Sequence, residues 1–249
     1  MNPPTGLCYT SFISKASWQW MRHRYGIEHA PTLPPGRRGK GFGIVKIYDI
    51  SMTIREDMQT FNNGENSPAI RCIQDHSAGG VYESEIKLNV HTGTHVDAPL
   101  HMLEGGATIE SIPLERLVGP ARVLDLQHVG DAVRASDLEP FAIQPGEWIL
   151  LKTRSSFSDS FDFGFPFLTQ DGAKFLVNKG INGVGIDALG IERSQDGFPT
   201  HKLLFRHGII ILEGLRLGEV PAGTYWMVVA PLKLEMTEAA PARAFLIGT

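Results

Sequence analysis

Cysteine is scarce in this sequence. Cys8 and Cys72 are the only two among 249 residues, and they are far too distant in sequence to form a CxxC pair. This scarcity argues against a disulfide framework and favours a reducing compartment, so we expect a cytoplasmic protein. No apolar run reaches the roughly 20 residues that span a bilayer, and no segment has the pattern of a signal peptide. We therefore expect no association with a membrane.

An excess of positive charge is also missing. The chain has 23 Lys and Arg against 27 Asp and Glu, which gives a formal net charge of −4 at pH 7. Proteins that bind nucleic acid usually carry a basic patch, so we expect no nucleic-acid partner and a small-molecule substrate instead. Hydrophobic residues make up 42% of the chain, which is ordinary for a globular protein with a sizeable core.

Residues 1–43 differ from the rest in composition. They are rich in proline and arginine and contain a single acidic residue, Glu28. Breakers without hydrophobic periodicity predict an N-terminal extension that is poorly ordered. An arginine-rich, acid-poor start is also compatible with a transit peptide, although a disordered tail is the commoner case. The folded domain is expected to cover residues 44–249.

Strand-like and helix-like patterns mix over the rest of the chain. The alternation of Ile86, Leu88 and Val90 predicts a half-buried strand. Thr169 and Gly180 flank a segment with helical spacing, as an N-terminal cap and a C-terminal stop would. Shorter helical turns are expected at 138–141 and 203–206, and buried strands at the apolar runs 123–126, 148–151, 184–186, 209–212 and 225–230. This mixture predicts an α/β or α+β domain and not a helical bundle.

One segment concentrates metal-binding side chains. The sequence HTGTHVDAPLH places His91, His95, Asp97 and His101 within eleven positions. On the predicted strand, His91 lies at the end, on the face away from the apolar side chains. Pro99 argues against one continuous helix, so the histidines are expected on a strand end and the loop that follows. Scattered surface histidines are the alternative, but the density of the cluster favours a Zn²⁺ or Mn²⁺ site.

A second candidate region lies further along the chain. His201 is followed twelve positions later by Glu213, which ends the apolar run 209–212. A carboxylate at the end of a core strand is costly unless it is paired or binds a metal. A salt bridge and a metal ligand are equally compatible with this pattern. His207 is a weaker candidate, expected in a loop or at a helix end.

These residues resemble the cyclase family, which includes bacterial kynurenine formamidases and isatin hydrolases. The family's HxGTHxDxPxH motif is matched at every fixed position by HTGTHVDAPLH, and the likeness extends over roughly residues 43–249. Tyr48–Ser51, Gly183–Asp187 and Glu213–Leu215 resemble its strands, and the PLKL and PARA stretches at 231–234 and 241–244 resemble its C-terminal signature. The resemblance implies a swivelling β/β/α fold, a mixed sheet flanked by short helices, in a homodimer or homotetramer.

The resemblance also implies roles for individual residues. His91, His95 and Asp97 would hold one metal, and Asp97 would bridge to a second metal held by His201 and Glu213. One or two Zn²⁺ or Mn²⁺ ions per chain are therefore expected. His101 would be the catalytic acid and base. Isatin hydrolases do not retain the glutamate, so Glu213 favours the formamidase branch.

The expected reaction is hydrolysis of an amide-type C–N bond in a small aromatic substrate, with N-formylkynurenine first and a cyclic amide such as isatin as the alternative. The aromatic segment 157–167 could form an apolar wall, and we expect Phe61 and Phe163 to contact the substrate. Residues 61–65 replace a Pro-Gly-Asp stretch common in formamidases. Two alternatives of other classes remain: an Fe(II) oxygenase using the His-x-Asp pattern, and a non-catalytic metal-binding module.

Overall fold

The structure is a computed structural model, and it describes residues 45–61 and 66–248. The predicted extension at residues 1–43 and most of the 61–65 stretch lie outside the described residues. The order of elements is β1 (Lys46–Asp49), β2 (Ala69–Gln74), α2 (His76–Gly79), β3 (Glu83–Lys87), β4 (His95–Asp97), η1 (Pro99–His101), η2 (Ile109–Ser111), η3 (Leu114–Arg116), β5 (Val118–Asp125), β6 (Ala132–Val133), α3 (Ala135–Leu138), β7 (Trp148–Lys152), η4 (Arg154–Phe157), β8 (Phe167–Leu168), α4 (Gln170–Lys179), β9 (Gly183–Ile186), α5 (Pro199–Arg206), β10 (Ile210–Glu213), β11 (Gly223–Pro231) and β12 (Ala239–Gly248).

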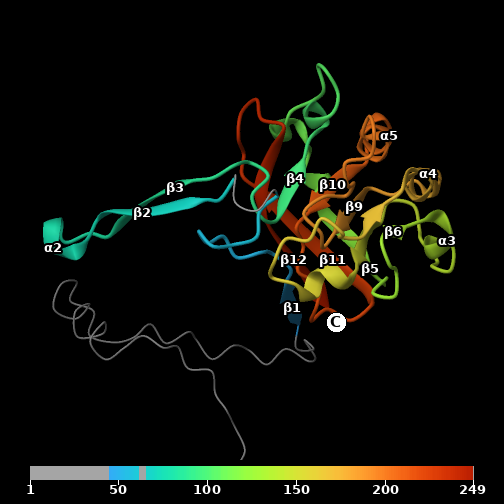
Figure 1. Cartoon of the computed structure of the whole chain (residues 1–249), viewed down its shortest axis with the longest axis horizontal. Helices are drawn as coiled ribbons and strands as arrows, with labels where there is room; N and C mark the ends of the chain where they lie inside the picture. Colours follow the sequence, from blue (N-terminus) through green and yellow to red (C-terminus); the bar gives the residue numbers. More distant parts are fainter. Residues whose placement is uncertain (1–44, 62–65, 249) are drawn as a thin grey trace, which may run out of the picture. The chain divides into compact units, whose positions relative to one another are not determined.

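One mixed sheet of eight strands organises the domain, in the order β1-β12-β11-β5-β7-β9-β10-β4. The pairings β5–β7, β7–β9 and β9–β10 are parallel. The other pairings in this order are antiparallel. Strand β12 also pairs with β4, the last strand in the order, so the sheet closes on itself. The mixed sheet with few short helices confirms the predicted fold class (Figure 1).

The central strands are buried on both faces, which explains their continuous apolar runs. In β7, Ile149 and Leu151 belong to a core shared with α3, α4 and α5, whereas Trp148 and Leu150 belong to a second core on the other face. Figure 1 shows α3, α4 and α5 together on one side of the sheet, whereas α2 lies at the tip of the β2–β3 arm. All five predicted buried runs lie in or overlap strands of this sheet.

Helix α4 has the ends that its sequence predicts. The Thr169 side chain accepts a hydrogen bond from the backbone N–H of Gly172, and Gly180 ends the helix with φ of 68°. A hydroxyl at the first cap satisfies one of the unpaired N–H groups, and glycine adopts the left-handed conformation without a Cβ clash. Local capping chemistry therefore fixes the length of this helix.

The strand predicted at 86–90 is wrong in its extent and burial. Strand β3 ends at Lys87, and every residue of it is exposed. It pairs only with β2, forming a two-stranded arm that extends away from the main sheet in Figure 1. Ile86 is 56% exposed. The alternation is present in the sequence, but within residues 45–61 and 66–248 all five residues of β3 are exposed, so the pattern produces no half-buried strand there.

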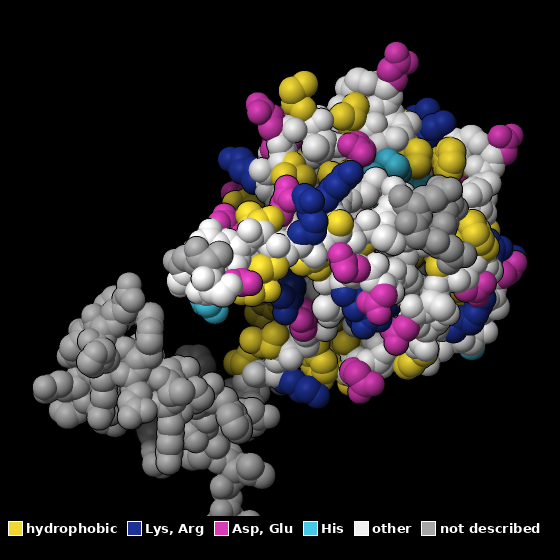
Figure 2. Space-filling model, turned by 60° about the vertical axis from the view of Figure 1, so that its left-hand side comes forward, with side chains coloured by type: hydrophobic (Ala, Val, Ile, Leu, Met, Phe, Trp, Pro, Cys, Tyr) yellow, Lys and Arg dark blue, Asp and Glu magenta, His cyan; other side chains and the backbone are white. Residues whose placement is uncertain are grey.

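Two further observations concern the surface. Within the part of the chain that the structure describes, no helix is long and apolar enough to cross a bilayer. On the face drawn in Figure 2, Lys and Arg side chains are interspersed with Asp and Glu side chains and with scattered hydrophobic ones. Such a mixture is ordinary for a protein surface.

Candidate metal centre

The pairing of β4 with β10 forms the base of the candidate site. In this antiparallel pair, His95 lies opposite Glu213 and Asp97 lies opposite Ile211. Side chains alternate along a strand, so Val96 enters the second core while His95 and Asp97 point to the other face. Both of them are almost fully buried, at 1% exposure. Two segments more than 100 residues apart in sequence thus present three polar side chains to one volume.

Glycines allow the turn that precedes β4 to approach the end of β10. Gly93 and Gly214 have φ of 65° and 68°, and a Cβ on Gly214 would lie 2.3 Å from the carbonyl oxygen of Gly93. Thr94 sits between them, where its hydroxyl donates to the Gly214 carbonyl and accepts from the backbone N–H of Met52. These contacts hold the HTGTH segment against the β10 end.

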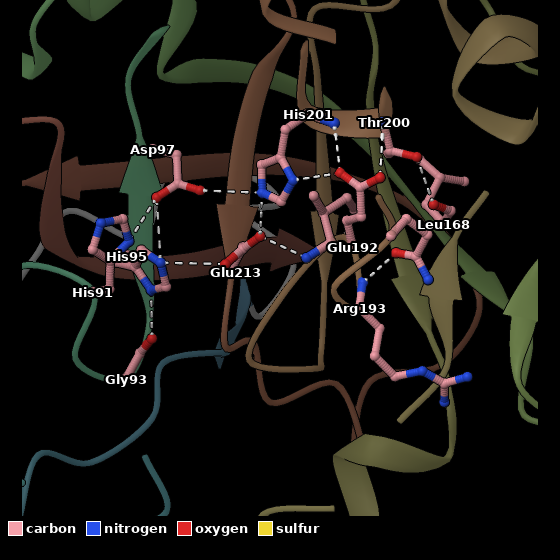
Figure 3. A network of polar contacts seen from close by, with 12 residues as sticks. His91, Gly93, His95, Asp97, Leu168, Glu192, Arg193, Thr200, His201 and Glu213 are labelled. Atoms are coloured by element: carbon pink, nitrogen blue, oxygen red, sulfur yellow. Dashed lines mark hydrogen bonds and ion pairs between the residues drawn. The ribbon is translucent and has the colours of Figure 1, made fainter. Parts of the chain in front are cut away.

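Asp97 lies at the centre of the polar cluster in Figure 3. Its Oδ1 lies 3.1 Å from Nδ1 of His91 and 3.4 Å from Nε2 of His95, and its Oδ2 lies 3.9 Å from Nε2 of His201. Glu213 occupies a similar position, with Oε2 at 3.4 Å from Nε2 of His95 and Oε1 at 3.5 Å from Nε2 of His201. Each carboxylate therefore faces a histidine of the HTGTH segment and also His201.

His201 comes from α5 and is held by a residue that the sequence analysis did not identify. Glu192, 4% exposed, accepts hydrogen bonds from the backbone N–H groups of Thr200 and His201, and its Oε2 lies 2.9 Å from Nδ1 of His201. This leaves Nε2 of His201 directed at the two carboxylates (Figure 3). A carboxylate behind a metal-binding imidazole commonly fixes its tautomer and orientation. In the sequence, Glu192 is only an acid nine residues before His201, and its burial comes from the fold.

His101 lies on the short helix η1 beside the same cluster. Its ring centroid is 4.4 Å from that of His91 and 5.8 Å from that of His201. Burial lowers the pKa of His101, which keeps its imidazole neutral near pH 7. The structure therefore brings all six predicted residues, His91, His95, Asp97, His101, His201 and Glu213, to one place. It does not put His91 at a strand end, because β3 stops at Lys87 and His91 lies in the following turn.

Several buried polar atoms of the cluster face one another as ion pairs but form no hydrogen bond. Nε2 of His95 and both side-chain oxygens of Asp97 have no hydrogen bond with any described residue. Buried polar groups normally form hydrogen bonds or bind an ion. The atoms that face one another are imidazole nitrogens and carboxylate oxygens, which are the donors that Zn²⁺ and Mn²⁺ accept. The chemistry of this cluster therefore fits a divalent metal.

The donor atoms fall into two overlapping groups. His91, His95 and Asp97 offer one set of atoms that lie within 4.8 Å of one another, and Asp97, His101 and His201 offer a second set. Asp97 belongs to both, as expected of a bridging carboxylate. The presence of His101 in the second group means that its position suits a ligand as well as a proton carrier.

The charges of the cluster are strongly coupled. Burial lowers the pKa of His95, but the Asp97 and Glu213 carboxylates outweigh it and raise the pKa to about 10. Burial likewise lowers the pKa of His201, and Glu192, Glu213 and Asp97 raise it to about 10. Burial raises the pKa of Asp97, yet His95 and His91 hold it well below its usual value. Without a metal, protons on the imidazoles therefore balance the buried carboxylates.

A cavity of about 290 Å³ opens above the cluster. His91, His95, His101, His201 and Glu213 line its polar part, and its other walls include Phe61, Met102, Leu189 and Phe198. Phe61 therefore borders this cavity, and its contact with a substrate stays a prediction. Phe163 does not line this cavity: its ring packs edge-on against Phe61 at 6.0 Å and is 54% exposed. Any influence of Phe163 on a bound molecule would act through Phe61.

The chain is similar to known hydrolases in sequence and structure. The putative cyclase family matches residues 48–193. The kynurenine formamidase of Maricaulis maris is 34% identical over 208 residues, which cover 82% of this chain and 98% of that protein. A predicted metal-dependent hydrolase from Bacillus stearothermophilus has a solved structure that is 53% identical, with a TM-score of 0.75, covering 82% of this chain and 99% of the other.

Isatin hydrolase A from Labrenzia aggregata is a more distant match, 25% identical with a TM-score of 0.72 over 82% of this chain and 94% of the other. The predicted family, fold and enzyme class are confirmed by these similarities, and the chain is a metal-dependent hydrolase. Because the family match spans more than half of the chain and a formamidase matches it over nearly its own full length, this chain belongs to the cyclase family.

Proposed function

We propose that this hydrolase cleaves the C–N bond of aryl formamides, and that N-formylkynurenine is converted to kynurenine and formate. One observation carries the proposal: Asp97 and Glu213 lie between histidines on both sides, next to a cavity whose other walls include the apolar side chains of Phe61, Met102, Leu189 and Phe198. Two carboxylates shared by two sets of imidazoles suit a pair of metals. The apolar walls suit an aromatic ring.

The residues divide the chemistry among them. His91, His95 and Asp97 would hold one divalent ion, and His201, Glu213 and Asp97 would hold the other. Such an ion supplies Lewis acidity, which lowers the pKa of a water ligand towards about 7 and polarises the scissile carbonyl. His101 is neutral near pH 7 and half-buried beside the cluster, so it can take a proton from the attacking water and deliver it to the leaving nitrogen.

Zn²⁺ or Mn²⁺ is the proposed metal, at one or two ions per chain, because nitrogen and oxygen donors suit both. Three histidines and two carboxylates exceed the two-histidine, one-carboxylate set of an Fe(II) oxygenase, and the closed mixed sheet differs from the jelly roll of those enzymes. We further propose a cytoplasmic homodimer or homotetramer that acts on a small molecule. Elemental analysis and light scattering of the purified protein test the metal and the assembly.

A cyclic amide such as isatin is the second candidate substrate, favoured by the structural similarity to isatin hydrolase A. The deciding experiment compares kcat/KM for N-formylkynurenine and isatin at equal metal loading. We expect N-formylkynurenine to be preferred at least about tenfold, which corresponds to about 1.4 kcal/mol in the transition state. The opposite preference would reject the formamidase assignment and leave the metal-dependent hydrolase intact. Turnover of neither substrate by the metal-loaded protein would reject both substrate assignments.

A further inference from the structure

A strained aromatic residue borders the cavity. Among the described residues, three that are not glycine have positive φ: Ser194 at 50°, Phe198 at 50° and Met236 at 59°. Ser194 and Phe198 both line the cavity above the metal cluster, whereas Met236 lies in an exposed loop elsewhere. A bulky side chain in the left-handed region is unfavourable and persists only where the surroundings impose it. Phe198 is the more costly of the two because its ring is large.

The backbone at Phe198 is fixed by its neighbours. Its N–H donates to the carbonyl of Gln195, and its own carbonyl accepts from the N–H of Lys202. Pro199 follows directly and begins α5, and Gly197 before it also has positive φ, at 73°. Glycine or asparagine would adopt this left-handed conformation with less strain. The conformation of the turn therefore does not explain the presence of phenylalanine.

Helix capping does not explain it either. Phe198 occupies the position before the first turn of α5, but its side chain makes no cap hydrogen bond. The free N–H groups of Thr200 and His201 are instead satisfied by the Glu192 carboxylate. The start of the helix is thus secured by a different residue, and the side chain of Phe198 is not needed for it.

The core makes no use of this ring. Phe198 is 40% exposed, unlike Phe205, which also lies beside His201 but is 5% exposed and packed in the core. The Phe198 ring stands nearly perpendicular to the His201 imidazole, with centroids 6.4 Å apart. Its free surface therefore faces the cavity next to a candidate metal ligand.

We propose that Phe198 determines specificity for aromatic substrates: its ring packs against the aryl ring of the substrate beside His201, and the strained backbone holds it there. This inference rests on the proposed function, since it concerns the same cavity. Aromatic rings attract one another in offset or edge-on arrangements beyond the effect of area alone. A ring carried on a backbone that is already fixed needs less ordering when the substrate binds.

The test uses the full-length, metal-loaded enzyme and three variants: Phe198→Gly, Phe198→Leu and, as a control, Met236→Gly. For N-formylkynurenine, Phe198→Gly should raise KM about tenfold and change kcat by less than about threefold. This pattern is expected when a residue binds the ground state and the transition state of the substrate equally well. The KM of Phe198→Leu should lie between those of the wild type and Phe198→Gly, because leucine keeps apolar volume but lacks the ring. Met236→Gly should leave both constants unchanged.

Thermal unfolding and metal content distinguish a role in substrate binding from a structural role of Phe198. Glycine relieves the left-handed strain in both glycine variants, so neither Tm should fall by more than a few degrees, and metal content should stay at the wild-type level. A large fall in Tm or a loss of metal in Phe198→Gly would show a structural residue and overturn the proposal. An unchanged KM would overturn it as well.

Equilibrium binding separates this inference from the proposed function. If the wild type hydrolyses isatin but not N-formylkynurenine, the same variants are tested with isatin, which is also aromatic, and the same tenfold effect is expected. If neither is turned over, the probe is kynurenine itself, titrated calorimetrically into the metal-loaded proteins. Weaker binding of kynurenine to Phe198→Gly than to Met236→Gly supports the role of Phe198, and equal binding rejects it.

Discussion

At the scale of single residues, the cluster depends on groups that do not themselves offer an atom to the metal. Glu192 fixes Nδ1 of His201, and the carbonyl of Gly93 lies 2.8 Å from Nδ1 of His95. Both contacts leave Nε2 of the ring for the centre of the site. The rings of His201 and His95 are thus oriented before any ion binds. Less side-chain ordering is therefore needed when a metal binds.

We expect Glu192→Gln to weaken metal binding about 10–100-fold, the usual effect of removing a carboxylate behind a ligating histidine. The amide keeps the shape but removes the charge that holds His201. Metal affinity is measured by competition with a chromophoric chelator. The control is Glu147→Gln, which breaks a partly buried ion pair with Arg122 away from the cluster and should lower stability without changing metal affinity. Equal metal affinity of wild type and Glu192→Gln would assign Glu192 to helix capping alone.

His101→Ala should keep its metal content and lose about 10²–10⁴-fold in kcat, the usual contribution of a positioned acid and base. The physical reason is that the His101 ring lies beside the cluster, half-buried, with a pKa lowered by burial. Metal content and kcat are measured on the same preparation, with the exposed His207→Ala as control. Because the ring also lies in the second donor group, loss of an ion in His101→Ala would make it a ligand and leave the proton carrier unassigned.

At the scale of elements, the site depends on the close contact between the β4 turn and the end of β10. Thr94 and Gly214 join these segments, and β12 pairs with β4 on its other side. His95, Asp97 and Glu213 therefore lie on strands that are hydrogen-bonded along both edges. Rigid strands place metal ligands more precisely than loops do.

We expect Gly214→Ala to destabilise the fold by roughly 2–4 kcal/mol and to reduce metal content, since the new Cβ would meet the Gly93 carbonyl in addition to the strain of positive φ. Gly105→Ala is the matched control: Gly105 has the same φ of 68°, but nothing lies within 4 Å of its Cβ position. It should lose only about 1 kcal/mol, the strain alone. Urea unfolding measures both. Similar losses in the two variants would mean that the close approach is unimportant.

At the scale of the whole molecule, metal binding, protonation and folding are linked. The pKa of about 10 for His95 and His201 lies above the usual value of 6.5. In the metal-free protein, these protons therefore stabilise the fold fully below about pH 6.5, and that stabilisation is lost as the pH rises through about 10. A metal needs neutral imidazoles, so it must displace these protons.

Metal binding between pH 7 and 8 should release about two protons per chain, and affinity should rise with pH. Calorimetric titration in two buffers of different ionisation enthalpy measures the release. Saturation at about 1,000 times Kd should add about 4 kcal/mol of stability, so a chelator should lower Tm by roughly 10 °C. Heats independent of the buffer, or a Tm insensitive to the chelator, would contradict the linkage.

The sequence by itself determined those features that depend on neighbouring residues. His91, His95, Asp97 and His101 are close in the chain, so their density was sufficient to predict a metal site. The capped ends of α4 and the apolar runs of β7 and β9 likewise follow from local chemistry. Each of these features needs only a few residues whose conformations are set by their own side chains and immediate neighbours.

The tertiary structure alone decided what depends on distant pairings. The register of β4 against β10 puts His95 opposite Glu213, and α5 brings His201 with Glu192 behind it. The alternation at Ile86 predicts a half-buried strand, yet among the described residues β3 is exposed along its whole length. Burial belongs to the packing of elements and not to the pattern within one of them. For that reason the ligands could be read from the sequence, but their convergence, their orienting partners and the cavity above them could not.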